Sequence, residues 1–412
     1  MRRLLVPLVG LFLLLPTLPI AAAQPGTPGA SAPPVELPTS PVGEQLAWVL
    51  AQLNGGAATL TEAELTAHFA PAYLTNVLPA PVLLDLLQQT AAQYAPVTVA
   101  GFAFPPTATG TVALVTLATG EDGAAYLTIE PIPPHRITRL DLTEAPAPPS
   151  LTGRRVDIGG RALYLDCTGG GSPTVVLEGG ISSDWAAVQP AVAGFARVFS
   201  YDRPDSPGSR SDPTPQRTAQ EVVDDLRALL AAAGESGPYV LVGHSLGGLY
   251  AQLFAYQHPD EVAGLVLADP TPEEFPARLA QMLESLGTPV PRAPHEPDVD
   301  DLSFAQMREA RGSGPFPPMP LIVLTHGRLA DPSERPPGWP IIEEERIWRE
   351  THAELARMVP NGHQIVAEGI GHDIHHEQPQ VVNDAVRQVV VAVRDPSTWA
   401  TPTASPTTTP GS

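Results

Sequence analysis

A serine lies between two glycines at the junction of two apolar segments. Residues 238–244, PYVLVGH, are typical of a buried strand, and residues 246–256, LGGLYAQLFAY, are typical of a helix. Ser245 falls in the tight turn between them, where bulky neighbours would clash and Gly243 and Gly247 supply the room. A serine presented on a turn from strand to helix can act as a nucleophile. We therefore interpret Ser245 as the nucleophile of a covalent reaction.

A serine hydroxyl needs a base within hydrogen-bond reach to remove its proton. The best candidate is His372, which follows a strand-like run in AEGIGHDIHHEQP, residues 367–379. His375 and His376 fall on the helical side of this segment, and we expect them to be surface groups. The spacing H-x-x-H-H could indicate a metal site, but no matching carboxylate or cysteine set accompanies it. We therefore expect no metal.

The third member of such a site is a carboxylate that orients the histidine and stabilises its charged form. Asp269 ends the strand-like run GLVLADP, and Asp331 lies four residues after the glycine of LTHGRLADP. We favour Asp269 because it falls directly at the end of a predicted strand, whereas Asp331 lies in a loop rich in proline. Asp331 remains the second candidate, and Asp269 could instead only cap the loop that follows it.

Strand-like runs rich in valine and leucine alternate with amphipathic helices from residue 151 onward. The predicted strands cover residues 161–167, 174–180, 196–204, 239–245, 262–270, 320–327 and 364–372, and the main predicted helices cover residues 218–234, 246–257, 344–359 and 379–394. This alternation predicts an α/β fold with a mostly parallel sheet and helices on both faces. Active sites in such sheets lie at the carboxyl ends of the strands. Ser245, Asp269 and His372 are all predicted to lie at that edge.

Residues 151–395 resemble α/β-hydrolase-fold serine hydrolases of the bacterial esterase-like group. The resemblance is carried by LDCTGGGSPTVVLEGG, SYDRPDSPGSRSD, VLVGHSLGGLYA, LVLADP and GHDIHHEQP. It implies that Ser245 attacks and that His372, last in chain order, acts first as base and then as acid. One departure is that Asp205 and Pro207 stand where many relatives have glycines, which changes the loop that holds them.

The resemblance also implies an oxyanion hole and a cap. The oxyanion donors would be the N–H of Leu246 and that of Gly180, which matches the third residue of the family's His-Gly-x segment. Glu178 replaces the usual histidine, which leaves a main-chain donor intact. The cap would be an insertion at about residues 271–318. Its apolar residues could line a cleft or pack onto the sheet: Phe275, Leu279, Met282, Leu283, Leu286 and Phe304.

Residues 42–145 predict a small α+β domain that precedes the hydrolase domain. Leu46, Val49 and Leu53 recur at helical spacing, and Thr61 with Glu64 is typical of a helix start. Two strand-like runs then flank a Glu-Asp-Gly turn in residues 111–131. The segment resembles cystatin-like and nuclear-transport-factor-2-like accessory domains in its first helix (Trp48, Leu50 and Asn54), in HFAPAYL and in IEPIPPHRITRLDL. We expect it to pack or to gate substrate.

The two ends of the chain are typical of an exported protein. Residues 1–23 begin with two arginines, continue as an apolar stretch and end in three alanines, which predicts a signal peptide cut before Gln24. An uncleaved anchor is the alternative, which three prolines in the stretch disfavour. Residues 24–41 predict a disordered leader, and residues 396–412 a Pro/Thr-rich tail. We expect a secreted or extracytoplasmic protein whose mature chain has no stable membrane span.

Composition narrows the possible partners. Lys and Arg total 23 against 44 Asp and Glu, so the formal charge is −21, and no basic run is present. This balance argues against binding to nucleic acid. Cys167 is the single cysteine of the chain, so no intrachain disulfide can form. Its place in YLDCT indicates a small apolar residue of a strand rather than a nucleophile.

Taken together, these features predict an extracytoplasmic serine hydrolase that needs no cofactor. Its substrate would be a small-molecule carboxylic ester, or less readily an amide, cleaved through an acyl-enzyme. A serine nucleophile argues against the epoxide hydrolase and haloalkane dehalogenase branches of the fold, which use aspartate. Two alternatives stay open: cofactor-free peroxidase or lyase chemistry on the same fold, and a secreted binding protein in which residues 42–145 take the ligand.

Overall fold

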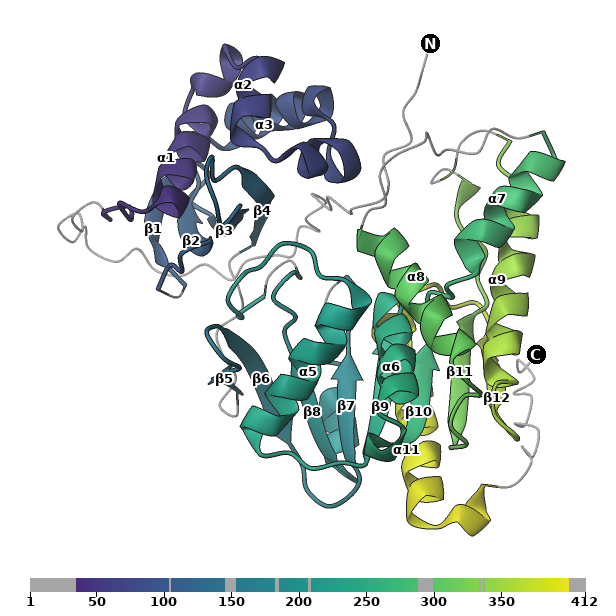
Figure 1. Ribbon diagram of the computed structural model, residues 1–412. Helices are drawn as coiled ribbons and strands as arrows, with labels where there is room; N and C mark the ends of the chain where they lie inside the picture. The colour runs from purple at the N-terminus through teal and green to yellow at the C-terminus, as the bar shows by residue number, and fades with distance from the viewer. Residues whose placement is uncertain are drawn as a thin grey trace, which may run out of the picture. The chain divides into compact units, whose positions relative to one another are not determined.

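The computed structural model describes most of the chain as two compact units (Figure 1). The described residues are 35–103, 105–144, 153–181, 185–206, 209–287, 299–332, 335 and 338–399. One unit comprises residues up to 146 with residues 213–215, and the other comprises residues 147–212 and 216–412. The predicted signal peptide, the leader as far as residue 34 and the tail from residue 400 lie outside the described residues.

The first unit is a small α+β unit in which the helices come before the sheet, as predicted. Its helices are α1 (Pro41–Leu53), α2 (Glu62–His68) and α3 (Ala80–Tyr94), and its strands are β1 (Thr98–Phe102), β2 (Gly110–Thr116), β3 (Asp122–Ile129) and β4 (Ile137–Glu144). The strands form an antiparallel sheet in the order β1-β2-β3-β4. The predicted start of α2 is confirmed: Thr61 Oγ1 accepts from the Glu64 N–H, and Glu64 Oε2 accepts from the Thr61 N–H at 2.8 Å.

The second unit is built on an eight-stranded sheet in the order β5-β6-β8-β7-β9-β10-β11-β12. Its strands are β5 (Gly153–Asp157), β6 (Ala162–Thr168), β7 (Thr174–Glu178), β8 (Arg197–Tyr201), β9 (Tyr239–His244), β10 (Val262–Ala268), β11 (Leu321–His326) and β12 (His363–Ala367). The pairs β5/β6 and β6/β8 are antiparallel, and every other pair in this sheet is parallel. The predicted mostly parallel sheet is confirmed.

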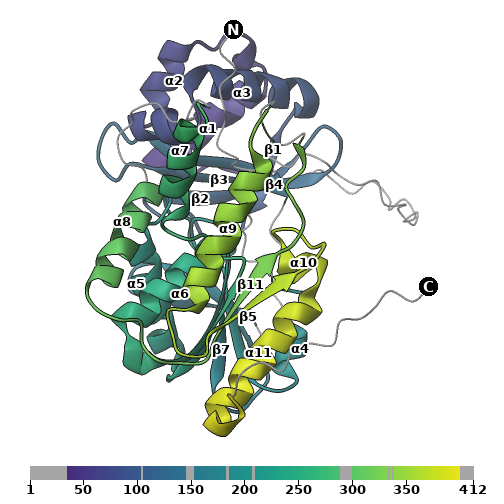
Figure 2. The same ribbon diagram turned by 90° about the vertical axis from the view of Figure 1, so that its right-hand side faces the viewer.

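Helices cover both faces of this sheet (Figure 2). They are α4 (Gln189–Ala193), α5 (Ala219–Ala233), α6 (Leu246–Gln257), α7 (Phe275–Ser285), α8 (Val299–Gly312), α9 (Ile341–Ala356), α10 (Ile374–Glu377) and α11 (Pro379–Arg394). Strand β9 shows why both faces are apolar: Leu241 packs into the core with α5 and α6, while Val240 and Val242 pack into the core with α11. Successive side chains of a strand point to opposite faces of the sheet. A strand with helices on both faces must therefore be apolar throughout.

The predicted cap region contains α7 and α8. Phe304 of α8 is 8% exposed and belongs to the core beneath α5 and α6. The ring of Phe275 on α7 lies edge-on to Trp348, 4.8 Å between centroids, whereas Leu286 is 53% exposed. Of the apolar residues predicted in the cap, Phe275 and Phe304 therefore pack onto the rest of the second unit, whereas Leu286 is exposed. Within the residues that the structure describes, no helix is both long and apolar enough to span a bilayer.

Candidate active site

Ser245 occupies the turn between β9 and α6 in a strained conformation. Its backbone has φ 55° and ψ −125°, a region that residues other than glycine rarely adopt. The turn is held from both sides, because the Ser245 N–H donates to Ala268 O at 3.2 Å and Ser245 O accepts from the N–H groups of Gly248 and Thr271. The strand, turn and helix predicted around the serine are all present.

The two glycines beside the serine are required by close backbone contacts. A Cβ atom on Gly243 would overlap the carbonyl of Gly247, and one on Gly247 would overlap the carbonyls of Glu178 and Gly179. The turn thus packs directly on the segment that follows β7. This contact explains why both positions need glycine and places that segment beside the serine.

Asp269, directly after β10, is fully buried and surrounded by hydrogen-bond donors. Its Oδ2 lies 2.6 Å from His372 Nδ1 and 2.7 Å from His326 Nδ1. Its Oδ1 accepts from the His326 N–H and from Trp348 Nε1, each at 3.0 Å. Burial alone would raise the pKa of Asp269, but the hydrogen bonds from His326 and His372 outweigh burial and hold it well below the usual range. Asp269 is therefore a buried, ionised carboxylate.

The structure places Asp269, and not Asp331, against the predicted base. Asp331 is exposed in the loop after β11. His372 lies between β12 and α10, and its side chain is 44% exposed, so its ring is open to a reactant. The carbonyl of His372 lies 3.0 Å from His244 Nε2, and His244 directly precedes Ser245. The sheet thus brings Ser245, Asp269 and His372 to one edge.

Within the described residues, no hydrogen bond joins Ser245 Oγ to His372 Nε2. Catalytic hydrogen bonds are often long or poorly aligned before a substrate binds. The contact between the His244 side chain and the His372 carbonyl nevertheless connects the two segments at this point.

The two expected oxyanion donors belong to residues next to the serine. A Cβ atom on Gly180 would lie 2.9 Å from Ser245 Cβ, so the Gly180 backbone runs directly beside the serine. Leu246 is the first residue of α6, where the N–H has no partner within the helix. In the part of the chain that the structure describes, neither N–H donates to another backbone group. The oxyanion role expected for these two N–H groups stays a prediction.

A known family covers this unit. The model of the "Alpha/beta hydrolase family" matches residues 167–385, which include Ser245, Asp269 and His372. The chain belongs to the alpha/beta hydrolase family. The uncharacterized protein YqjL of Bacillus subtilis is 26% identical over 234 residues, which cover 54% of this hydrolase and 85% of YqjL. Lipase LipV of Mycobacterium tuberculosis is 36% identical over 91 residues, but this match spans only 32% of LipV.

Two esterases are among the solved structures to which this chain is similar. The hydrolase is 24% identical to a thermophilic esterase from Thermogutta terrifontis, with 58% of this chain and 98% of that chain covered and a TM-score of 0.41. It is 18% identical to carboxylesterase CesB from Bacillus subtilis, with 57% and 90% covered and a TM-score of 0.39. These similarities concern the fold.

Sequence reasoning missed His326, the last residue of β11. Both of its ring nitrogens face carboxylates: Nδ1 lies 2.7 Å from Asp269 Oδ2, and Nε2 lies 2.9 Å from Glu345 Oε2. Burial lowers the pKa of His326, but the hydrogen bonds to Asp269 and Glu345 outweigh burial and raise it to about 9. His326 is thus a charged imidazolium at neutral pH. Its position at the end of a predicted strand is the signal that could have found it.

The expectation that His375 is a surface group is wrong. His375 is only 3% exposed, and its ring packs against Trp185 and against His244, with 4.1 Å between the two imidazole centroids. The short helix α10 directs this side chain inward toward the serine turn, while His376 remains exposed. Burial lowers the pKa of His375 to about 3, so the ring is neutral.

Two groups among the described residues could offer a metal ion three ligands. One is His244, Asp373 and His375, and the other is Asp269, His326 and His372; in each group the ligand atoms lie within 4.8 Å of one another. Asp373 and His375 lie in the segment after β12, but the sequence could not show that His244, at the end of β9, approaches them, because that contact depends on the fold. The ligand atoms of the second group already form hydrogen bonds with one another.

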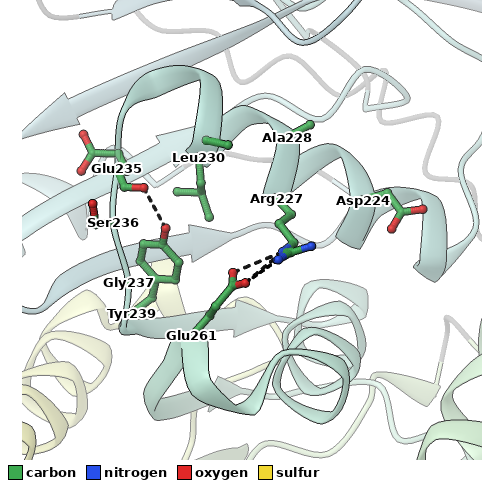
Figure 3. Close-up of a pocket in the computed structure, with 10 residues that line it drawn as sticks. Asp224, Arg227, Ala228, Leu230, Glu235, Ser236, Gly237, Tyr239 and Glu261 are labelled. Carbon is green, nitrogen blue, oxygen red and sulfur yellow. Dashed lines mark hydrogen bonds and ion pairs between the residues drawn. The ribbon is translucent and has the colours of Figure 1, made fainter.

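A hollow of about 600 Å³ lies elsewhere on the hydrolase unit (Figure 3). Tyr239 lines it, with its hydroxyl donating to Glu235 O, and the ion pair of Arg227 and Glu261, 2.7 Å, crosses it. Tyr239 begins β9, whereas Ser245 follows the carboxyl end of the same strand. The hollow therefore lies at the opposite edge of the sheet from the serine.

Proposed function

We propose that this hydrolase cleaves small-molecule carboxylic esters through an acyl-enzyme on Ser245. The observation that carries the proposal is the 2.6 Å contact between His372 Nδ1 and the buried Asp269, at the sheet edge where Ser245 is held with φ 55°. A buried ionised acid on one nitrogen leaves the other nitrogen of His372 free to accept a proton. A serine hydroxyl is a poor nucleophile at neutral pH and needs a base of this kind to take its proton.

The reaction proceeds in two steps, acylation of Ser245 and hydrolysis of the acyl-enzyme. Ser245 Oγ bonds to the acyl carbon as its proton passes to His372 Nε2, and the alkoxide then leaves with that proton as an alcohol. A water molecule next attacks the acyl carbon, giving a proton to His372, and the carboxylic acid departs as Oγ recovers its proton. Asp269 keeps Nδ1 protonated in both steps and stabilises the imidazolium that forms each time.

The N–H groups of Gly180 and Leu246 would hold the oxyanion of each tetrahedral intermediate. Preorganised donors of this kind act most strongly on charge that develops in the transition state, and loss of one donor costs about 10²–10³ in kcat. The ester class is supported by the similarity to LipV, which is named as a lipase. Amides remain a lesser possibility with the same residues. Residues 1–23 support action outside the cytoplasm.

The test is activity-based labelling of the purified protein with a fluorophosphonate, together with hydrolysis of p-nitrophenyl esters of increasing acyl length. We expect the wild type to label and to turn over short esters, and Ser245→Ala to lose labelling and at least about 10⁴-fold in turnover. Ser236→Ala, in the loop before β9 at the other edge of the sheet, is the matched control and should behave as wild type. Equal labelling of Ser245→Ala would refute the proposal. Halide peroxidation without ester turnover would favour a peroxidase instead.

A further inference from the structure

A buried arginine lies beneath the segment that carries Gly180. Arg203, two residues after β8, is 4% exposed, and all of its nitrogens contact acceptors. Nη1 donates to Gly179 O at 2.5 Å and to Glu178 Oε1 at 3.1 Å, while Nη2 donates to Gly180 O. Nε lies 3.3 Å from Asp205 Oδ1. The guanidinium thus binds two successive main-chain carbonyls of the segment beside the serine.

The geometry of a peptide unit links these carbonyls to the oxyanion donor. Gly179 O and the N–H of Gly180 belong to the same trans peptide, in which the two groups point in opposite directions. Because Arg203 holds Gly179 O on one side, the Gly180 N–H must face the other side. A hydrogen bond from a charged donor to the carbonyl also polarises the amide and makes its N–H a stronger donor.

The guanidinium is itself held in place by buried groups. Glu178 is 2% exposed, and its second oxygen accepts from the Tyr201 hydroxyl at 2.6 Å. Arg203 also lies over the ring of Tyr250, 5.2 Å from its centroid. Buried ion pairs are poor sources of stability because both charges lose their hydration. A network of this kind directly under Gly180 therefore suggests a role in shaping the segment rather than in stabilising the fold.

We propose that Arg203, paired with Glu178, is a positioning residue that fixes and polarises the Gly179–Gly180 peptide so that the Gly180 N–H stabilises the oxyanion. This inference rests on the proposed function, since it assigns a role in the same reaction. It also gives a function to Glu178, which replaces the histidine usual at this position: its carboxylate pairs with the arginine that orients the neighbouring peptide.

The test compares Arg203→Lys with Arg197→Lys in the full-length protein. A lysine at 203 keeps the charge but can reach only one of the two carbonyls. Arg197 is the matched control: it begins β8, the strand that Arg203 follows, and it pairs with Glu235 Oε2 at 2.9 Å, at the edge away from Ser245. The readouts are melting temperature, kcat and KM for p-nitrophenyl butyrate, and the affinities of butyrate and of an alkyl boronic acid, which forms a tetrahedral adduct on serine.

We expect Arg203→Lys to lower kcat by about 10²-fold with KM within about threefold, because a misplaced donor acts on the transition state. Boronic acid affinity should fall by a similar factor and butyrate affinity should not. Arg197→Lys should keep kcat within about threefold. A kcat for Arg203→Lys within threefold of wild type overturns the proposal, as does a loss confined to KM or one that leaves boronic acid affinity unchanged.

Two further outcomes are decisive. If Arg203→Lys does not fold, Glu178→Gln replaces it as the test variant, because glutamine keeps the shape of the side chain and removes the ion pair. We expect the kcat of Glu178→Gln to fall about three- to tenfold. An unchanged kcat overturns the proposal. An inactive, unlabelled wild type refutes the proposed function and this inference with it. An active wild type with an active Arg203→Lys refutes only the role of Arg203.

Discussion

His326 binds the same oxygen of Asp269 that orients His372. The two Nδ1 atoms lie 2.7 and 2.6 Å from Asp269 Oδ2, and the second nitrogen of His326 lies 2.9 Å from Glu345. Asp269 therefore contacts two histidines. One of them, His326, is held in its charged form by a second carboxylate, that of Glu345. Part of the negative charge of Asp269 is neutralised before His372 takes up a proton.

The acid can be identified by separate substitution of the two candidates. Asp269→Asn removes the charge that stabilises the His372 imidazolium and lets Nδ1 adopt the wrong protonation state, so we expect kcat to fall by about 10⁴. Asp331→Asn is the matched control, because Asp331 is exposed, and should leave kcat within about twofold. Steady-state kinetics on a short acyl ester measure both. A large loss in Asp331→Asn with none in Asp269→Asn would reverse the assignment.

Replacing His326 should change the pH dependence of the reaction. His326→Asn keeps a donor toward Asp269 but removes the positive charge, so Asp269 would stabilise the His372 imidazolium more strongly. We expect the acid limb of the kcat/KM profile to move to higher pH. His352 Nδ1, 3.7 Å from Asp269 Oδ1, and Trp348 also face the carboxylate and stay in place. A profile that superimposes on that of the wild type would show that His326 does not influence the base.

Ser245 and Asp269 could be found because each directly follows a strand that is predicted from its local apolar pattern. His372 was found because it follows the last strand-like run, although β12 ends earlier, at Ala367. His326 is the last residue of β11. Its contact with Asp269 could not be foreseen, since it depends on β10 and β11 being neighbours in the sheet. The burial of His375 was missed because a helix as short as α10, Ile374–Glu377, shows no periodicity that would reveal its inner face.

The contacts of Arg203 could not be predicted from the sequence either. The segment SYDRPDSPGSRSD marked the position of Arg203, but the main-chain carbonyls of Gly179 and Gly180 carry no sequence signal. Their approach depends on β7 and β8 lying side by side in parallel, so that both carboxyl ends meet. Polar contacts to main chain across strands thus require the topology, whereas the order of strands and helices could be predicted from apolar patterns alone.

His326 should also make folding stability depend on alkaline pH. Its pKa is raised to about 9 from 6.5, so the stabilisation is fully present below pH 6.5 and is lost as pH rises through 9. We expect the free energy of unfolding to decline between pH 7 and 9.5 by at most about 1.4 kcal/mol per pH unit from this group. Urea unfolding across that range should show a shallower decline for His326→Asn. Parallel curves for the two proteins would contradict the assignment.

Acid should destabilise the hydrolase through three buried neutral histidines. Burial lowers the pKa of His244 and of His375 to about 3 and that of His352 to about 4, against an unfolded value near 6.5. The unfolded chain therefore binds more protons below pH 6.5, and stability is lost as pH falls toward 4, by at most about 1.4 kcal/mol per pH unit for each histidine.

Urea unfolding between pH 7 and 4.5 measures this loss, and His352 offers the sharpest variant. His352 is fully buried, and its ring nitrogens contact Thr325 Oγ1 and Pro270 O, so His352→Gln should lower stability at pH 7 yet reduce the slope of stability against pH. The exposed His376 is the matched control, and His376→Asn should keep the wild-type slope. If His352→Gln keeps that slope as well, the ring of His352 is not held neutral by burial, and other groups cause the acid sensitivity.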